Sequence, residues 1–203
     1  RKIMASPLQS FQSLERAAAP ATTPITLVEA KAQMRVETSD DDTLITRLIA
    51  AAVAFTDGQG ALGKAMITQT WRQWVGNNPS EVQLAMLPAA SVTAVKYYDS
   101  DGTLQTATLA DFEVFGTSTY KYIKPISGKS WPVAQTRSDA VAIEYTTGYG
   151  DATTDVPDTL RHALLMLVAH WYENRENSTM DRLESTPFGF DEMINIERGN
   201  WYG

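Results

Sequence analysis

The stretch DTLRHALLMLVAHWYENRE, residues 158–176, carries the helix on which the rest of the fold depends. Its apolar residues occupy most of a helical circumference from Leu160 to Trp171, and its last turn is charged. Pro157 precedes it, and proline suits the first turn of a helix because that position needs no N–H donor. We predict a helix over residues 157–176 that is buried on one side by its own subunit and on the other by its own or a neighbouring subunit.

Both histidines of the chain lie in this stretch, at His162 and His170. Eight helical residues separate them by about 12 Å along the axis and rotate them off a common face. A shared metal ion would need a spacing of three or four residues. No nucleophile elbow or pair of carboxylates accompanies them, so the sequence predicts no catalytic residue, no metal site and no cofactor, and it assigns both side chains a structural role.

Two shorter helices are predicted near the start of the chain. Thr26 and Glu29 have the spacing of a capping box at the start of a helix over residues 27–35. A second helix is expected over 41–57, with Ser39 as its cap, a run of aspartates at its positive end and a glycine after it.

Between these helices the periodicity changes to two. Residues 65–147 contain β-branched and aromatic segments separated by turn residues, which is typical of antiparallel strands. The predicted fold class is therefore α+β, a small helical bundle with an inserted, largely antiparallel β-sheet or sandwich. Residues 1–24 are expected to form a mobile arm with one helical turn at Phe11–Arg16, residues 25–176 the main domain, and residues 177–203 a C-terminal extension.

Composition narrows the possible functions. The chain has 203 residues, a net charge of −7 and no cysteine. An acidic chain without basic runs does not suit a dedicated nucleic-acid binder, although DNA can pass such a protein without being gripped. No apolar run reaches the roughly 20 residues of a membrane span, the first residues lack the pattern of a signal peptide, and the lack of thiols suits a cytosolic protein.

Three segments imitate known motifs. Gly58–Ala65 matches phosphate-binding glycine patterns, but here a helix precedes the glycines and a strand follows them, which is the reverse of the required order. Thr146–Asp151 imitates a potassium filter, and Asp99–Thr103 imitates part of a calcium loop. We interpret the three as a helix end with its linker, a strand end turning through two glycines, and a hairpin turn.

Several segments together resemble a known family. In chain order they are ITLVEAKAQMRVETSDDDTLITRLIAAAVAF, MITQTWRQWV, LPAASVTAVKYYDSDGT, SWP, IEYTTGYGDA and VPDTLRHALLMLVAHWYENRE. Over about residues 25–176 they are similar to the head-tail connector (adaptor) proteins of long-tailed bacteriophages. The resemblance implies a structural virion protein, not an enzyme. It implies a homo-oligomeric ring that sits beneath the portal and is twelvefold like the portal. The ring would extend the DNA channel without specific DNA binding, and it would offer a platform to a downstream neck or tail protein. The implied location is the head-tail junction of the virion, and the host cytoplasm during assembly.

Aromatic and apolar residues near the C-terminus are the candidate partner-binding residues. Trp171 and Tyr172 are the amphipathic type that interfaces favour. In the extension, Ile194 and Ile196 alternate with polar residues, which would suit adding a strand to a partner's sheet, with the portal as the favoured partner. Folding back onto its own core is the alternative for this segment. The complete predicted set is Trp171, Tyr172, Phe188, Phe190, Met193, Ile194, Ile196, Trp201 and Tyr202.

Two other functional classes remain open at this stage. A β-sandwich binding module for a carbohydrate or peptide would place a set of aromatic residues on one sheet face, namely Trp71, Trp74, Tyr97, Tyr98 and Tyr120. A nucleotide hydrolase would use Gly58–Lys64, against which the order of helix and strand already argues.

Overall fold

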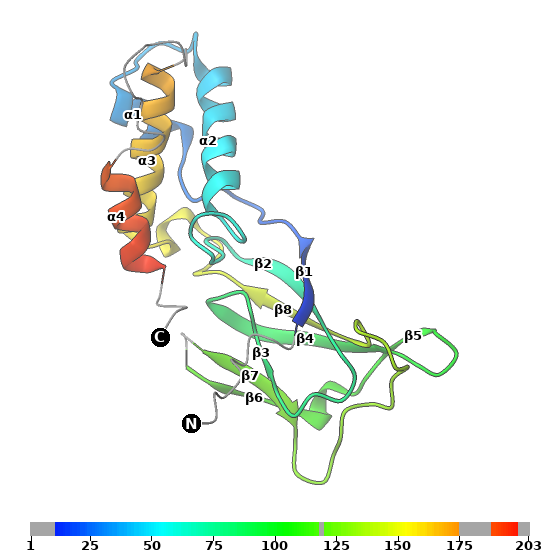
Figure 1. Ribbon diagram of the computed structural model, residues 1–203. Helices are drawn as coiled ribbons and strands as arrows, with labels where there is room; N and C mark the ends of the chain where they lie inside the picture. Colours follow the sequence, from blue (N-terminus) through cyan, green and yellow to red (C-terminus); the bar gives the residue numbers. More distant parts are fainter. Residues whose placement is uncertain (1–10, 118–119, 175–187, 199–203) are drawn as a thin grey trace. The chain divides into compact units, whose positions relative to one another are not determined.

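The structure is a computed structural model, and it describes residues 11–117, 120–174 and 188–198. The chain forms two compact units. The β unit comprises the residues up to Pro20 together with Thr68–Gly148, and the helical unit comprises Ala21–Ile67 together with the residues from Tyr149 onward. Helices and antiparallel sheets are thus both present, and the predicted α+β class is confirmed (Figure 1).

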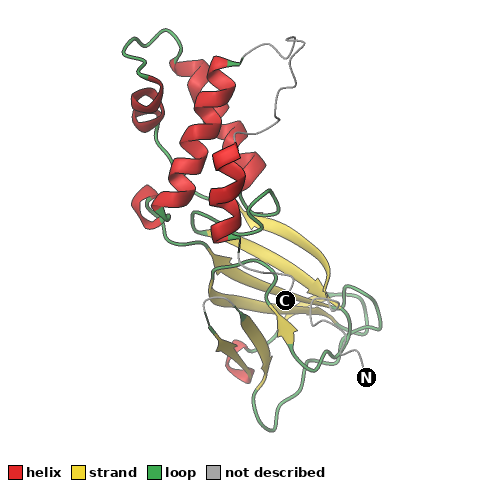
Figure 2. Cartoon of the chain, turned by 60° about the vertical axis from the view of Figure 1, so that its left-hand side comes forward, coloured by secondary structure: helices red, strands yellow, loops and turns green. Residues whose placement is uncertain are grey.

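The helical unit contains α1 (Leu27–Met34), α2 (Asp42–Thr56), α3 (Asp158–Glu173) and α4 (Phe188–Glu197). The helices predicted over 27–35, 41–57 and 157–176 are confirmed as α1, α2 and α3, with ends that differ by a few residues. These three helices pack on one another, and α4 packs on α3 (Figure 2). The helix predicted from the opening stretch therefore contacts every other helix of the unit.

Local chemistry explains where α1 and α2 begin. The capping box of α1 is confirmed: Thr26 N donates to Glu29 Oε2 at 2.7 Å, and Glu29 N donates to Thr26 Oγ1 at 3.2 Å. The predicted Ser39 cap of α2 is wrong, because Asp41 occupies that position without a capping side-chain bond. Ser39 contributes its backbone carbonyl instead, which accepts from Asp42 N at 3.2 Å, so a backbone turn starts this helix.

The glycines after α2 form a tight turn, as the sequence predicts. Gly58 has a φ of 63°, and a Cβ on Gly60 would lie 2.3 Å from the carbonyl oxygen of Phe55. Buried Asp57 accepts a hydrogen bond from Met66 N at 2.8 Å across the turn. The segment that imitates a phosphate loop is therefore a helix end followed by a turn, held by the bond between Asp57 and Met66.

One apolar core holds the helical unit together. Side chains from all four helices, from the turn after α2 and from the segment before α3 contribute to it. Its buried members are Ile25, Ala30, Ile45, Ile49, Ala52, Leu62, Met66, Ile67, Val156, Leu160, Ala163, Leu164, Leu167, Val168, Phe190 and Ile194.

The β unit contains two antiparallel sheets. The five-stranded sheet has the order β1-β2-β8-β4-β5, and the three-stranded sheet has the order β3-β7-β6. The strands are β1 (Phe11–Ala18), β2 (Gln69–Val75), β3 (Val82–Gln83), β4 (Ala89–Tyr98), β5 (Leu104–Thr106), β6 (Phe112–Gly116), β7 (Lys121–Pro125) and β8 (Val141–Thr147). The predicted hairpin turn at Asp99–Thr103 is confirmed between β4 and β5, where Asp99 Oδ1 accepts from the backbone N–H groups of Asp101 and Thr103.

A buried polar cluster joins the two sheets. Gln73 of β2 donates from Nε2 to the carbonyl of Gln83 at 2.8 Å and accepts from Ala85 N at 2.9 Å. Tyr145 of β8 accepts from Met86 N at 2.9 Å, and burial raises the pKa of its hydroxyl well above the usual range. Each buried polar group here has a partner, as burial requires, so the cluster fixes how β3 lies against the larger sheet.

Two expectations at the chain ends are wrong. Phe11–Arg16 is not a helical turn: these residues belong to β1, which pairs antiparallel with β2. Residues 188–197 are not an extended strand: they form α4, which buries Phe190 and Ile194. These two are four residues apart and share one helical face, and that spacing prevailed over the alternation of Ile194 and Ile196.

Candidate interaction surfaces

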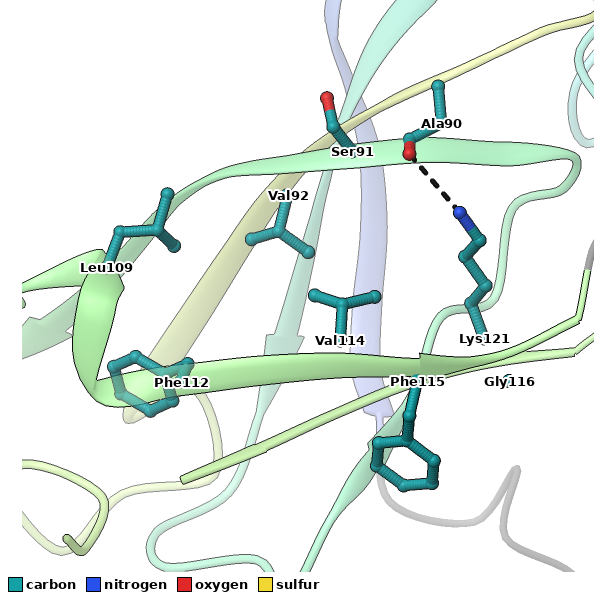
Figure 3. A pocket seen from close by; sticks show the side chains of 9 residues that line it. All are labelled: Ala90, Ser91, Val92, Leu109, Phe112, Val114, Phe115, Gly116 and Lys121. Atoms are coloured by element: carbon teal, nitrogen blue, oxygen red, sulfur yellow. Dashed lines mark hydrogen bonds between the residues drawn. The ribbon is translucent and has the colours of Figure 1, made fainter. Parts of the chain in front are cut away.

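A groove lies between β4 and β6 in the β unit. It has a volume of about 380 Å³ (Figure 3). Val92 and Val114 point toward each other across it, and Lys121 closes one end by donating from Nζ to the carbonyl of Ala90 at 3.2 Å. The full lining is Ala90, Ser91, Val92, Leu109, Phe112, Val114, Phe115, Gly116 and Lys121.

The groove borders an open strand edge. Among the described strands, β6 pairs only with β7. The carbonyl of Asp111 and the N–H of Thr117 bond to the β7 side of this hairpin. Because backbone groups alternate along an antiparallel ladder, Glu113 and Phe115 also face β7, and the N–H and C=O of Val114 face away from it. Such an edge is a template for an added strand.

The opposite face of β6 and β7 is exposed and mixed in character. The ring of Phe115 stacks on Tyr122 at 5.4 Å, and Lys124 Nζ lies 4.8 Å from the Phe115 centroid. Lys124 also pairs with Glu113 at 3.2 Å. Figure 3 shows the Phe115 ring on the opposite side of β6 from the Val114 side chain. Aromatic side chains such as Phe115 and Tyr122 are of the type that protein interfaces favour.

A ladder of charges crosses the five-stranded sheet. Arg72 pairs with Glu15 at 2.8 Å and with Glu144 at 2.6 Å, and Lys96 reaches Glu144 at 2.9 Å. Burial raises the pKa of Glu144, but hydrogen bonds from Lys96 and Arg72 outweigh it and hold the pKa below its ordinary value. The two acidic and two basic groups pair within the sheet, so this face offers little unpaired charge for a nucleic acid.

The aromatic face expected for a carbohydrate or peptide module does not form. Trp71 lies in the interior and Trp74 on the other face of the same strand, where it stacks on Tyr98 at 5.7 Å. Tyr97 and Tyr98 are adjacent in β4 and therefore point to opposite faces. Exposed Tyr120 lies beside β7 in the other sheet. The prediction of one shared aromatic face is wrong.

In the helical unit, the aromatic end of α3 packs on its neighbours. Trp171 and Tyr172 are half-buried against the core, and the Trp171 ring lies 6.2 Å from exposed Phe55 of α2. Tyr172 donates its hydroxyl hydrogen to Asp41 at the start of α2. The exposed parts of Phe55 and Trp171 are available to a partner, while the Tyr172 hydroxyl is used within the unit.

A second polar connection ties α3 to α1. Arg161 pairs with Glu29 and also with Asp158 at 2.8 Å. Burial raises the pKa of Glu29. Hydrogen bonds from Thr26 and the charge of Arg161 lower this pKa by more than burial raises it, so the net shift is downward. The capping carboxylate of α1 therefore also anchors α3.

The remaining predicted partner-binding residues divide by burial. Phe190 and Ile194 lie in the interior of their own unit, Met193 is partly buried, and Ile196 is 73% exposed. Phe188 begins α4. Trp201 and Tyr202 lie outside the described residues. The structure thus uses Phe190 and Ile194 internally and leaves Ile196 on the surface.

Sequence reasoning missed the groove, although it identified the strands that form it. The FEVFG segment, residues 112–116, lies within the stretch 65–147 predicted to contain strands, but strand order decides that it lies at an edge opposite β4. Within the described ranges, no three His, Asp or Glu side chains are arranged to hold a metal ion, and no described helix is both long and apolar enough to span a membrane. His162 is exposed, and His170 lies 3.3 Å from Asn174 Nδ2.

The comparison with protein families identifies the chain. Residues 24–184 match the family model of the head completion protein. The chain belongs to the head completion protein family. The match spans both units and confirms the predicted resemblance to phage head-tail connector proteins, and with it a structural connector role. No curated protein matches the chain in sequence.

Solved structures with a similar fold come from gene transfer agent (GTA) particles. A chain in the neck of an empty GTA particle computed with C6 symmetry has a TM-score of 0.73 and 23% identity, covering 92% of this chain and 95% of that chain. A chain in the virion of a native GTA particle has a TM-score of 0.72 and 22% identity over the same shares. A chain from the neck of the native particle computed with C12 symmetry has a TM-score of 0.64 and 22% identity, again over these shares. At these identities the likeness shows a shared fold.

Proposed function

We propose that this head completion protein forms a homomeric ring at the head-tail junction of a virion, bound to the portal on one side and to a neck or tail protein on the other. The family match to residues 24–184 is the observation that carries the proposal. The chains of similar fold come from necks computed with C6 and C12 symmetry, which supports a ring, and we propose twelve copies. The protein assembles in the host cytoplasm and acts as a structural part, not as an enzyme.

Ring assembly requires two different surfaces on each copy, because head-to-tail contacts close by rotation. The β unit offers the open β6 edge with its groove and the aromatic patch of Phe115 and Tyr122. The helical unit offers the exposed parts of Phe55 and Trp171. We assign these surfaces to contacts between copies and with neighbouring neck components.

DNA passes through the proposed ring without specific contacts. The net charge is −7, and the basic residues Arg72 and Lys96 are paired with carboxylates on the sheet face. A protein that gripped DNA would offer unpaired basic groups to the phosphates, and its affinity would fall steeply with salt. Weak attraction suits a channel that must release DNA during delivery.

The test is to remove the gene from the phage or particle that encodes it and to examine the assembly products by electron microscopy. The proposal predicts separate heads and finished tails, and restoration of joined particles when the chain is supplied from a plasmid. Normal joined particles in its absence would refute the connector role. A defect in tail length or head size, with joining intact, would contradict it as well.

A further inference from the structure

The hairpin formed by β4 and β5 has an open edge of its own. β5 lies at the end of the five-stranded sheet, and among the described strands it pairs only with β4. The carbonyl of Thr103 and the N–H of Ala107 bond to the β4 side of this hairpin. Because backbone groups alternate along an antiparallel ladder, the N–H and C=O groups of Leu104 and Thr106 face away from β4. The β5 edge is therefore a template for a further strand, as the β6 edge is.

The β5 and β6 edges match each other in spacing. On β6 the outward groups belong to Val114 and Gly116, which are two residues apart like Leu104 and Thr106 on β5. In an antiparallel pairing between two copies, Gly116 of one copy lies opposite Leu104 of the other. Val114 then lies opposite Thr106, and the two pairs form four hydrogen bonds. A shift of two residues toward Phe112 would lose one of them, because the Phe112 N–H already donates within the turn before β6.

This register also places an apolar side chain in the groove. Directly opposite residues of antiparallel strands project to the same face, so Thr106 lies on the Val114 side of β6. Leu104, which is 44% exposed within one copy, lies on that same face beside Gly116. A side chain cannot replace the hydrogen of Gly116, because its Cβ would lie 2.1 Å from the carbonyl oxygen of Tyr120. The groove of about 380 Å³ thus receives Leu104 at the one position of β6 that carries no side chain.

Charge complementarity selects the antiparallel direction. Among the described residues that line the groove, Lys121 is the one charged residue, and it lies opposite Gly116 in the β6–β7 pair. Antiparallel pairing brings the acidic turn Asp99–Thr103 of the other copy to this end of the groove. Parallel pairing would bring the turn to the other end of β6, beside Asp111, whose carboxylate already pairs with Lys129 at 2.9 Å. An acidic turn therefore matches the Lys121 end and not the Asp111 end.

The groove and the hairpin turn lie at opposite ends of β4. Ala90, whose carbonyl accepts from Lys121, is at the start of this strand, and the turn to β5 follows Tyr98 at its end. The strand has 10 residues and so spans about 30 Å. Figure 1 shows the β4–β5 hairpin projecting from the β unit. Two different, separated surfaces are what a head-to-tail contact needs in order to repeat from copy to copy.

We propose that the β4–β5 hairpin of each copy pairs with the β6 edge of the next copy, with Leu104 in the groove and the acidic turn beside Lys121. The proposal rests on the proposed ring, and it names a second copy of this chain as the occupant of the groove. The added strand joins the three-stranded sheet of one copy to the five-stranded sheet of its neighbour.

Cysteine cross-linking tests this contact, since the native chain has no cysteine to interfere. Thr106→Cys and Val114→Cys chains are produced together during particle assembly, and the necks are treated with a short bis-maleimide, denatured and resolved by size. Opposite residues of paired strands have Cβ atoms about 4.5–5.5 Å apart, which the reagent can bridge. Each chain carries one cysteine, so no link can form within a chain. A second mixture, Asp101→Cys with Lys121→Cys, samples the charged end and guards against a folding defect in the first.

The contact predicts covalently joined pairs of chains from both mixtures. The control mixture, Thr106→Cys with Ala17→Cys, should give no such pairs, because Ala17 is exposed on β1 at the far edge of the five-stranded sheet. Rings that yield no joined pairs from either test mixture would overturn the hairpin contact and leave the proposed ring intact. A link from Val114→Cys to a different neck protein, identified by mass spectrometry, would also overturn it. Necks whose intact mass shows no ring of this chain would count against the ring and the contact together.

Discussion

Ile194 and Ile196 provide a matched pair for testing the packing of α4. They are the same residue type, two positions apart on one helix, yet Ile194 is 3% exposed and Ile196 is 73% exposed. Ile194→Ala removes three buried carbon atoms, which at about 0.8 kcal/mol each amounts to roughly 2.4 kcal/mol of lost burial. An unfilled cavity raises the expected cost into the range of about 2–5 kcal/mol. Ile196→Ala should cost less than about 0.5 kcal/mol.

Native-state hydrogen exchange is the appropriate assay because it reports the opening free energy of individual segments as well as of the whole unit. Ile194→Ala should lower the opening free energy of the α4 amides by the stated amount or remove their protection altogether. Ile196→Ala should leave protection nearly unchanged, apart from a small effect of helix propensity. Equal effects from the two substitutions would refute the assignment of Ile194 to the core and revive the expectation of a strand-forming tail.

Three further predictions follow from the contacts described above. Leu167→Ala on α3 should lower the unfolding free energy of the helical unit by about 2–5 kcal/mol, measured by urea denaturation, because the side chain is fully buried; a change below about 0.5 kcal/mol would contradict that burial. Glu144→Gln should reduce the free energy of unfolding at pH 7. The difference in unfolding free energy from the native chain should shrink below about pH 4.5, because the folded-state pKa of Glu144 lies below its ordinary 4.5 and the ionised carboxylate stops contributing in acid. A difference that does not depend on pH would count against the charge ladder. Val114→Lys at the open β6 edge should weaken ring assembly, measured as the mass of the assembled particle. The control Val133→Lys, at a 91% exposed position, should not weaken it. If the two variants assemble equally well, the β6 edge is excluded from the ring contacts.

Local signals in the sequence predicted most of the helical unit. Thr26 and Glu29 define the start of α1 through side-chain bonds to nearby backbone, and such bonds depend on a few adjacent residues only. The apolar pattern of α3 predicted its burial, and Leu160, Leu164 and Leu167 are fully buried.

Long-range pairing could not be predicted in the same way. The alternation in FEVFG predicts a strand, but the neighbours of that strand are decided by contacts between distant segments. The same limit explains the error at β1, because Glu15 gains its strand partner and its ion pair from Arg72, far away in sequence. The error at α4 arose because the sequence fits two patterns. Ile194 and Ile196 fit the alternation of a strand, while Phe190 and Ile194 fit the spacing of a helix. Packing against α2 and α3 selects the helix.

The copy number of the chain in an assembled particle tests the central claim most directly. A neck reconstruction without imposed symmetry should show a closed ring of identical copies between head and tail, and we expect twelve. Each copy should show the fold of the two units described here. A single copy, or copies placed on the capsid surface or on tail fibres, would contradict the account.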